Sequence, residues 1–301
     1  MSVPDVTPDL PPPAWRAMLG LLGRLPQGAL SRGFGRVSDI LLPTRLRRPV
    51  LGSFARVMGI DVAEAELPIV AYPTLNHFFV RRLRPGVRAW PSEPNVAASP
   101  VDGVLGQCGI LDGGRLVQAK GRWYDAASLL DDAEEAGRYR DGLFVTLYLS
   151  PRHYHRIHTP THGAVSKARH IPGALLPVNG PAVLHVADLF PRNERLVAYV
   201  DGPLGRIAVV AVGAYNVGRI STAFDEAWNA PPGEGGWVTN RLGARPHTRH
   251  YDPPVPLDTG KEIMAFHLGS TVVLLFEPGA GALVEGIQPG REVRLGEPLV
   301  R

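Results

Sequence analysis

A serine that follows a glycine and precedes an apolar run is the part of this sequence with the most distinctive chemical potential. Gly269 and Ser270 stand directly before Thr271 and the run Val272 to Phe276. Glycine has no Cβ and tolerates a strained turn, so the Ser270 hydroxyl could attack the Gly269 carbonyl. Elimination from the resulting ester would break the chain and leave a pyruvoyl ketone at the new N-terminus. Such a ketone is an electron sink suited to decarboxylating an amino acid, work that pyridoxal phosphate does elsewhere.

A serine hydroxyl is a weak nucleophile at neutral pH and needs a base. The segment from Tyr148 to Pro160 offers three histidines, whose ordinary pKa of about 6.5 leaves them mostly neutral. Asp102 lies in a turn-forming context upstream and could hydrogen-bond the far ring nitrogen of such a base. The spacing alone does not choose among the three candidates. They are His153, His155 and His158.

Two other cofactor chemistries receive less support from the sequence. The histidine segment could supply metal ligands, but no second group of Cys, His or carboxylate residues has zinc-ligand spacing, so we expect no metal. A pyridoxal enzyme needs a lysine, and the chain has only Lys120, Lys167 and Lys261. Lys120 alone has a suggestive setting, and we interpret it as structural or close to the substrate.

The composition is that of a globular protein. Of 301 residues, 45% are hydrophobic and 20% are charged, which allows a sizeable core. A net charge of +4 and a pI near 9.4 favour an anionic partner, either nucleic acid or lipid headgroups. The single cysteine, Cys108, excludes an intrachain disulfide. No apolar run reaches the roughly 18 residues that cross a bilayer, and the start lacks a secretory-signal layout, so we expect a cytoplasmic chain.

Residues 14–90 are predicted to be helical and amphipathic, after a flexible tail over residues 1–13. Apolar residues follow helical spacing from Trp15 to Leu25 and again from Leu30 to Leu41, with arginines alongside. Such helices suit the headgroup region of an anionic membrane, although the same apolar stripes could pack onto the rest of the protein.

From about residue 91, short apolar runs alternate with Gly, Pro and Asp turns, which predicts a largely antiparallel β core. The predicted strands cover residues 143–149, 195–200, 207–212 and 271–276. One helix is predicted near residues 125–137, and residues 228–258 are predicted to be long irregular loops. The predicted fold class is therefore α+β, with an N-terminal helical region (1–90) followed by a β-rich catalytic domain (91–301).

The motif at Ser270, the histidine segment and Asp102 together resemble the phosphatidylserine decarboxylase proenzymes of bacteria. The resemblance runs in order from about residue 28 to the end of the chain. Its further segments are Tyr72 to Arg81, Gln118 to Tyr124, Pro177 to Asn179, Leu189 to Arg195 and Val212 to Ala214.

The resemblance implies a role for each candidate residue. In self-cleavage between Gly269 and Ser270, the hydroxyl of Ser270 is the nucleophile, His158 is the base and Asp102 is the carboxylate partner of that base. The cofactor is then a pyruvoyl group made from Ser270, which forms a Schiff base with the amine of phosphatidylserine. The products are phosphatidylethanolamine and carbon dioxide. His155 is expected in the decarboxylation site as a proton donor or substrate contact.

The resemblance also implies how the chain is organised and where it works. Self-cleavage would give a large β chain (1–269) and a small α chain (270–301) that stay together as a heterodimer. The expected partners are phosphatidylserine and the anionic surface of the cell membrane, bound peripherally from the cytoplasmic side, with no nucleic acid.

Three positions depart from the family pattern. His77 stands where the family usually has glutamate, and Met264 stands where it usually has glycine shortly before the cleavage site. Met264 could change the flexibility of the strand that leads to the cut bond, and so the cleavage rate. His153 corresponds to a position that is often acidic, and we expect it on the surface.

Two functions of other classes remain open. A serine hydrolase would use Asp102, His158 and Ser270 without cutting its own chain, but the sequence lacks a Gly-x-Ser-x-Gly elbow and Ser270 opens a strand. A nucleic-acid-binding protein would explain the excess of arginine. The arginines are dispersed except near the N-terminus, and no aromatic-plus-basic recognition motif accompanies them.

Overall fold

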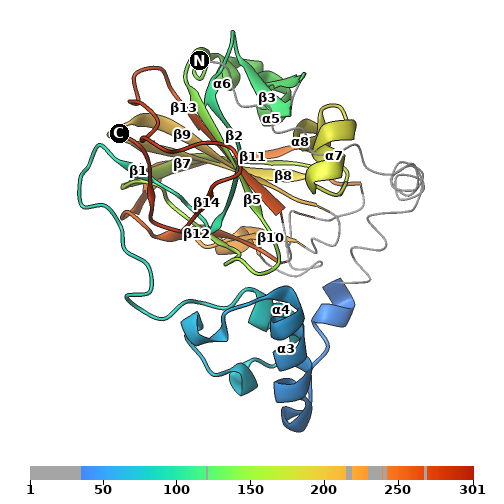
Figure 1. The fold of residues 1–301 in the computed structure, drawn as a ribbon. Helices are drawn as coiled ribbons and strands as arrows, with labels where there is room; N and C mark the ends of the chain where they lie inside the picture. Colours follow the sequence, from blue (N-terminus) through green and yellow to red (C-terminus); the bar gives the residue numbers. More distant parts are fainter. Residues whose placement is uncertain (1–34, 120, 215–218, 230–238, 240–242, 268–269) are drawn as a thin grey trace.

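An antiparallel β core with a helical segment on its N-terminal side makes up the fold (Figure 1). The computed structural model describes residues 35–301 except 120, 215–218, 230–238, 240–242 and 268–269. The predicted tail, the first amphipathic pattern, Lys120 and Gly269 therefore lie outside the described residues. The predicted α+β class is confirmed.

The core is an eight-stranded antiparallel sheet. Its strands in chain order are β2 (Gly103–Ile110), β5 (Leu143–Leu149), β7 (Gly163–Ile171), β8 (Arg195–Gly202), β9 (Gly205–Val212), β11 (His247–Leu257), β13 (Ser270–Phe276) and β14 (Glu292–Val293). Their order across the sheet is β11-β7-β8-β9-β13-β5-β2-β14. β13 lies between β9 and β5, and Val272 to Phe276 are fully buried. The four predicted strands are confirmed as β5, β8, β9 and β13, because continuous apolar, β-branched runs suit strands covered on both faces.

Among the described residues there are three smaller sheets. The first has the order β10-β12-β6, and each of the others is a pair, β1 with β15 and β3 with β4. Their bounds are β1 (Ala97–Ala98), β3 (Arg115–Ala119), β4 (Arg122–Asp125), β6 (Arg156–His158), β10 (Ile220–Thr222), β12 (Glu262–Phe266) and β15 (Pro298–Val300). Met264 is buried in β12 and paired on both sides, opposite Thr222 and Ile157. β12 ends at Phe266, and β13, within the large sheet, begins at Ser270.

Four short helices lie beside the β core, α5 (Ala126–Leu130), α6 (Ala133–Gly137), α7 (Gly180–His185) and α8 (Leu189–Arg192). The prediction of one helix over residues 125–137 is wrong, because two helices occupy this range. Asp131 adopts a left-handed conformation (φ 50°) that ends α5. Asp132 then caps α6, its carboxylate accepting from the Glu135 N–H at 3.0 Å.

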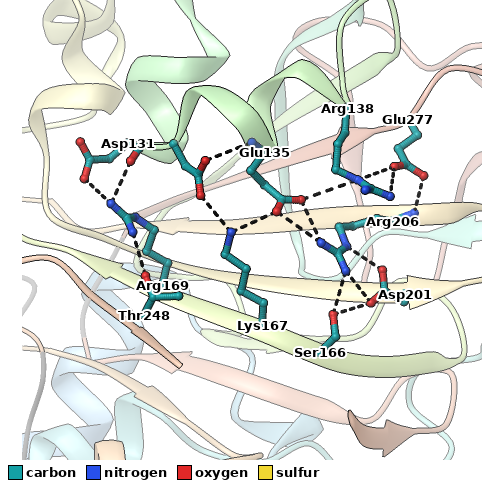
Figure 2. Close-up of polar contacts among 11 residues, drawn as sticks. Asp131, Glu135, Arg138, Ser166, Lys167, Arg169, Asp201, Arg206, Thr248 and Glu277 are labelled. Carbon is teal, nitrogen blue, oxygen red and sulfur yellow. Dashed lines mark hydrogen bonds and ion pairs between the residues drawn. The ribbon is translucent and has the colours of Figure 1, made fainter. Parts of the chain in front are cut away.

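Charged side chains tie α6 to the sheet (Figure 2). The Glu135 carboxylate accepts from Lys167 Nζ at 3.0 Å and from Arg206 Nη1 at 3.1 Å. Arg206 also donates from Nε to Asp201 at 2.7 Å. Cations from β7 and β9 thus converge on one helical carboxylate, which fixes the position of α6 over these strands.

This ion-pair network lies at the end of β13 farthest from Ser270, because the Arg206 N–H donates to Glu277, the residue after β13, at 2.9 Å. Burial alone would raise the pKa of Asp201, but hydrogen bonds from Arg206 and Ser166 outweigh it and hold the pKa below its ordinary value. Asp201 therefore stays ionised at neutral pH, and we assign the network a structural role.

The loop prediction for residues 228–258 is wrong over residues 247–257, which form the edge strand β11. β11 pairs with β7, with a shift of register between His250 and Val255. Pro253, Pro254 and Pro256 are compatible with this position, since an edge strand leaves one row of backbone groups unpaired and proline has no N–H to donate. A 3₁₀ turn, η3 (Glu226–Trp228), precedes the strand.

The N-terminal segment has a small apolar core of its own. Its elements are α3 (Thr44–Met58), η1 (Val62–Glu64), η2 (Ile69–Ala71) and α4 (Leu75–Phe79). Leu51 and Ala55 of α3 pack with Ile60, Tyr72 and Phe78. The helical prediction for residues 14–90 therefore holds over residues 35–38, α3 and α4, whereas the described residues between and after α3 and α4 form two 3₁₀ turns and irregular segments.

Candidate active site

Ser270 and Asp102 lie at the same end of the strands of the large sheet. Ser270 is the first residue of β13 and pairs with Leu149, the last residue of β5. On the other side of β5, Val104 of β2 pairs with Tyr148, and Asp102 directly precedes β2. Since neighbouring strands are spaced by about 4.8 Å, the backbones of Ser270 and Asp102 are roughly 10 Å apart.

His158 is held near the same end of the sheet by its backbone and by both ring nitrogens. Its N–H donates to the Pro100 carbonyl at 2.9 Å. Its Nδ1 lies 2.7 Å from the Gly260 carbonyl oxygen, which can only accept, so Nδ1 carries the proton. Nε2 then accepts from the Tyr154 hydroxyl at 3.1 Å.

The pKa of His158 is lowered, first by burial and also by the charge of Arg156. The hydrogen bond to Gly260 and the charges of Glu262 and Asp102 oppose this shift. His158 is therefore a neutral imidazole in one fixed tautomer, the form that a general base requires.

Gly260 can present its carbonyl to His158 only because it has no side chain. Its φ is +75°, and a Cβ on this residue would collide with the Trp90 ring. The Trp90 ring in turn lies 5.9 Å from the His158 ring, centroid to centroid. The indole thus covers both the histidine and the glycine that orients it.

The Asp102 carboxylate is held by Arg88 and by the backbone of the last part of the chain. Arg88 donates from Nε to Oδ1 at 3.0 Å and from Nη2 to Oδ2 at 2.6 Å, and the Leu295 N–H donates to Oδ1 at 2.8 Å. Arg88 also contacts Glu64. Within the described part of the chain, no hydrogen bond joins Asp102 to His158, and the carboxylate acts on the imidazole only through its charge.

His155 has surroundings of a different kind. It is fully buried, its Nδ1–H donates to the His153 carbonyl at 2.8 Å, and the Phe79 ring lies 4.1 Å away. Burial, followed by the positive charge of Arg81, lowers its pKa to about 3. Nε2 is therefore an unprotonated acceptor, and among the described residues it has no partner. The Phe266 N–H donates to the His155 carbonyl at 2.9 Å, so His155 lies beside the chain four residues before Ser270.

His153 holds the turn between β5 and β6. Its Nδ1 accepts from the Ser150 N–H at 3.0 Å, and its side chain is half-buried. The expectation of a surface residue is therefore only partly met. The three histidines of the segment have three different environments, which their spacing did not distinguish.

His267 fixes the chain where it leaves β12. Its Nδ1 lies 3.0 Å from Asn76 Oδ1 and its Nε2 lies 3.0 Å from Ser221 Oγ. Burial and the charge of Arg219 lower its pKa to about 3. Asn76 belongs to α4 and itself donates to Asp39 at 2.7 Å. The N-terminal segment therefore contacts the chain at His267, two residues before Gly269.

Sequence reasoning assigned no role to several residues that build this site. They are Arg81, Arg88, Tyr154, Gly260 and His267. The motifs quoted for the resemblance include Arg81 and Tyr154, but motif membership alone does not distinguish a packing role from a polar one. Gly260 offered the clearest signal, as a glycine in the turn Asp258-Thr259-Gly260-Lys261. Arg88 offered none, because its partners are distant in sequence.

Comparison with known proteins places the chain in a family. The sequence pattern of the phosphatidylserine decarboxylase family matches residues 75–301. A protein of Anaeromyxobacter sp. (strain K), named phosphatidylserine decarboxylase proenzyme, is 45% identical over 284 residues, 94% of this chain and 98% of that protein. Proteins with the same name from Myxococcus xanthus (39% over 282 residues; 94% and 97%) and Brevibacillus brevis (38% over 283 residues; 93% and 96%) are also similar.

A neutral histidine fixed in one tautomer, at the end of the antiparallel sheet where β13 begins, is an arrangement suited to proton transfer. With these relatives, the chain belongs to the phosphatidylserine decarboxylase family, whose members are carboxy-lyases.

A pyruvoyl group in this site would come from Ser270 itself, so the test of fit is what surrounds the start of β13. His155 lies beside the chain at Phe266, and its unprotonated Nε2 has no partner among the described residues, so it can accept a hydrogen bond from a group bound near the start of β13. The residues present therefore fit such a group. Over the described ranges, no cluster of three or more His, Cys, Asp or Glu residues could hold a metal ion.

The contact between Gly260 and His158 can be tested with an alanine substitution. Gly260→Ala places a methyl group against Trp90 at a left-handed backbone position, and we expect a loss of about 1–3 kcal/mol in the free energy of unfolding. The displaced carbonyl should also release His158 Nδ1, which ¹⁵N NMR of the imidazole reports as a mixture of tautomers.

The matched control is Gly279→Ala, since Gly279 has φ +89° but no atom within 4 Å of the place that the added methyl group would take. It shares the backbone penalty without the collision. Equal destabilisation of the two variants, with the His158 tautomer unchanged, would contradict the role assigned to Gly260.

Proposed function

We propose that this chain is a proenzyme that cuts itself between Gly269 and Ser270 and then decarboxylates phosphatidylserine with the ketone formed from Ser270. The observation that carries the proposal is the His158 imidazole, neutral and fixed in one tautomer at the sheet edge where Ser270 begins β13. The proenzyme names of the relatives support it.

In the proposed self-cleavage, His158 takes up the proton that the Ser270 hydroxyl loses as its oxygen bonds to the Gly269 carbonyl carbon. The carbon–nitrogen bond breaks, and the freed amine at residue 270 receives a proton. The negative charge of Asp102 favours the imidazolium in this step. Elimination from the ester then releases the Gly269 carboxylate, and hydrolysis of the remaining dehydroalanine yields the ketone and ammonia.

The proposed heterodimer is supported by the pairing of residues 270–301. β13 lies between β9 and β5, β14 pairs with β2, and β15 pairs with β1. A cut before Ser270 would leave all these ladders in place. The small chain therefore needs no covalent link to stay within the sheet.

Self-cleavage predicts two chains, and intact mass spectrometry of the purified protein measures them. We expect one chain ending at residue 269 and a second that starts with a ketone at residue 270. Ser270→Ala should stay in one piece, because it has no nucleophile. His158→Gln should be cut at least about 100-fold more slowly, because it has lost the base.

A wild-type protein that stays whole and keeps an ordinary serine would overturn this proposal. If that uncut protein also reacts with a fluorophosphonate at Ser270, the result favours the serine hydrolase alternative instead.

For decarboxylation, a ketone at position 270 would supply the electron sink for the carbon–carboxylate bond. The chain must also handle the substrate's protons, and we assign this to His155. Its Nε2 lone pair can take a proton from the substrate ammonium group and return it to Cα after carbon dioxide leaves. The Phe79 ring and full burial keep water from competing for that proton.

His155→Gln tests this assignment, since glutamine can hydrogen-bond but cannot carry a proton. We expect normal self-cleavage and a decarboxylation rate about 100-fold or more below that of the wild type, measured as carbon dioxide released per ketone. His153→Gln is the control, because the His153 imidazole is close by but only accepts a hydrogen bond from Ser150 in the turn. Decarboxylation by His155→Gln at the control's rate would contradict the assignment.

We also propose that the N-terminal segment attaches the protein peripherally to anionic membrane on the cytoplasmic side. Ten of the twelve large apolar side chains that are exposed among the described residues fall between residues 37 and 70. They are Val37, Ile40, Leu41, Leu46, Val50, Val57, Met58, Val62, Leu67 and Val70. Exposed arginines of α3, such as Arg45, Arg48 and Arg56, flank them. This combination suits anionic headgroups above an apolar layer. Among the described helices, none has the length and apolarity needed to span a bilayer.

Vesicle binding tests the membrane proposal. The double variant Leu41→Asp/Val57→Asp should bind vesicles of phosphatidylglycerol and phosphatidylcholine at least about ten-fold more weakly in sedimentation, because each site loses an apolar contact. Ile110→Asp is the control, since Ile110 is 65% exposed but lies on β2, outside this surface. Equal loss in both proteins, or none in the double variant, would refute the proposed surface.

A further inference from the structure

Both ring nitrogens of His158 are already hydrogen-bonded in this structure. Nδ1 faces the Gly260 carbonyl at 2.7 Å, and Nε2 accepts from the Tyr154 hydroxyl at 3.1 Å. Nδ1 already holds a proton, so only Nε2 can act as a base. Any proton that reaches Nε2 must therefore either displace the Tyr154 hydroxyl or pass through it.

Tyr154 is held in a way that opposes movement. It is 4% exposed, and its ring lies against the His158 ring at a centroid distance of 5.6 Å and an angle of 36°. Both of its neighbours in the chain are pinned. His153 accepts from the Ser150 N–H, and the His155 carbonyl accepts from the Phe266 N–H.

Tyr154 also lies in the turn that connects β5, the strand next to β13, with β6. The turn starts directly after Leu149, the partner of Ser270 in the sheet, and ends at β6, which carries His158. Burial raises the pKa of the phenol above its ordinary value, so the hydroxyl keeps its proton at neutral pH and can donate it.

From these contacts we propose that Tyr154 is the proton relay between Ser270 and His158 during self-cleavage, a role that rests on the proposed function. As the Ser270 oxygen bonds to the Gly269 carbonyl carbon, its proton passes to the Tyr154 oxygen. The phenolic proton passes at the same time to His158 Nε2. Tyrosine is thus unchanged overall, His158 becomes an imidazolium, and the serine oxygen gains the carbon. Because both transfers are concerted, no free tyrosinate forms in the buried site.

The first test removes the hydroxyl alone. Tyr154→Phe keeps the buried ring, and we expect the rate of self-cleavage to fall about 100-fold, measured by mass on precursor made by cell-free synthesis. Tyr139→Phe is the matched control, because Tyr139 is equally buried and its hydroxyl has no partner among the described residues. Thermal unfolding of both variants on a Ser270→Ala background checks that the fold is intact.

A second test uses the wild-type sequence and so does not depend on how a variant folds. Two protons in flight predict a curved dependence of the cleavage rate on the deuterium fraction in mixtures of light and heavy water. A single transfer predicts a straight line. Tyr154→Phe cleavage as fast as in the control, or a linear dependence in the wild type, would overturn the relay. A wild-type chain that is never cut would instead overturn the proposed function.

Discussion

The backbone ladders that β13 makes with β9 and β5 are the constraint on which the rest of this structure depends. They place Ser270 at one end of an inner strand, beside Leu149, and so set where any reacting group at this position must lie. They also bury Val272 to Phe276 on both faces, so β13 can neither slide nor leave without exposing the centre of the core. A reactive residue at the first position of such a strand is followed by a rigid, buried strand. The chain before it comes from β12, which belongs to a separate sheet, and is held at His267 by Asn76 and Ser221.

The resemblance implies that Asp102 orients His158, but in the structure other groups hold this histidine. The tautomer of His158 is set by the Gly260 carbonyl, and the Asp102 carboxylate is neutralised in large part by Arg88. A buried carboxylate without a cation would be costly, which explains the two-point contact with the guanidinium. The contact of Arg88 with Glu64 then connects this charge to the N-terminal segment. The site thus depends on elements from both ends of the chain.

The sequence foretold most of the sheet and only part of the site, for physical reasons. Runs such as residues 143–149 and 207–212 are apolar because they are buried on both faces, so composition alone reveals them. The sequence pattern does not indicate β11, because an edge strand has one open side and tolerates proline, arginine and histidine. The helix expected near residues 125–137 is divided at Asp131, whose left-handed conformation no periodicity reveals. His155 and His158 differ through groups far away in sequence, such as Phe79 and Gly260, which spacing cannot convey.

In the proposed function, the two histidines would serve two steps that need different proton affinities. His158 gains from the nearby charges of Glu262 and Asp102, so it can become an imidazolium once a proton reaches it. His155, buried and beside Arg81, has a pKa of about 3 and so holds a proton poorly. In the proposed function the substrate is an anion, and its negative charge near Arg81 would offset the cation that depresses this pKa. The ability of His155 to carry a proton would then arise with substrate binding, so proton transfer in the second step would be confined to the loaded site.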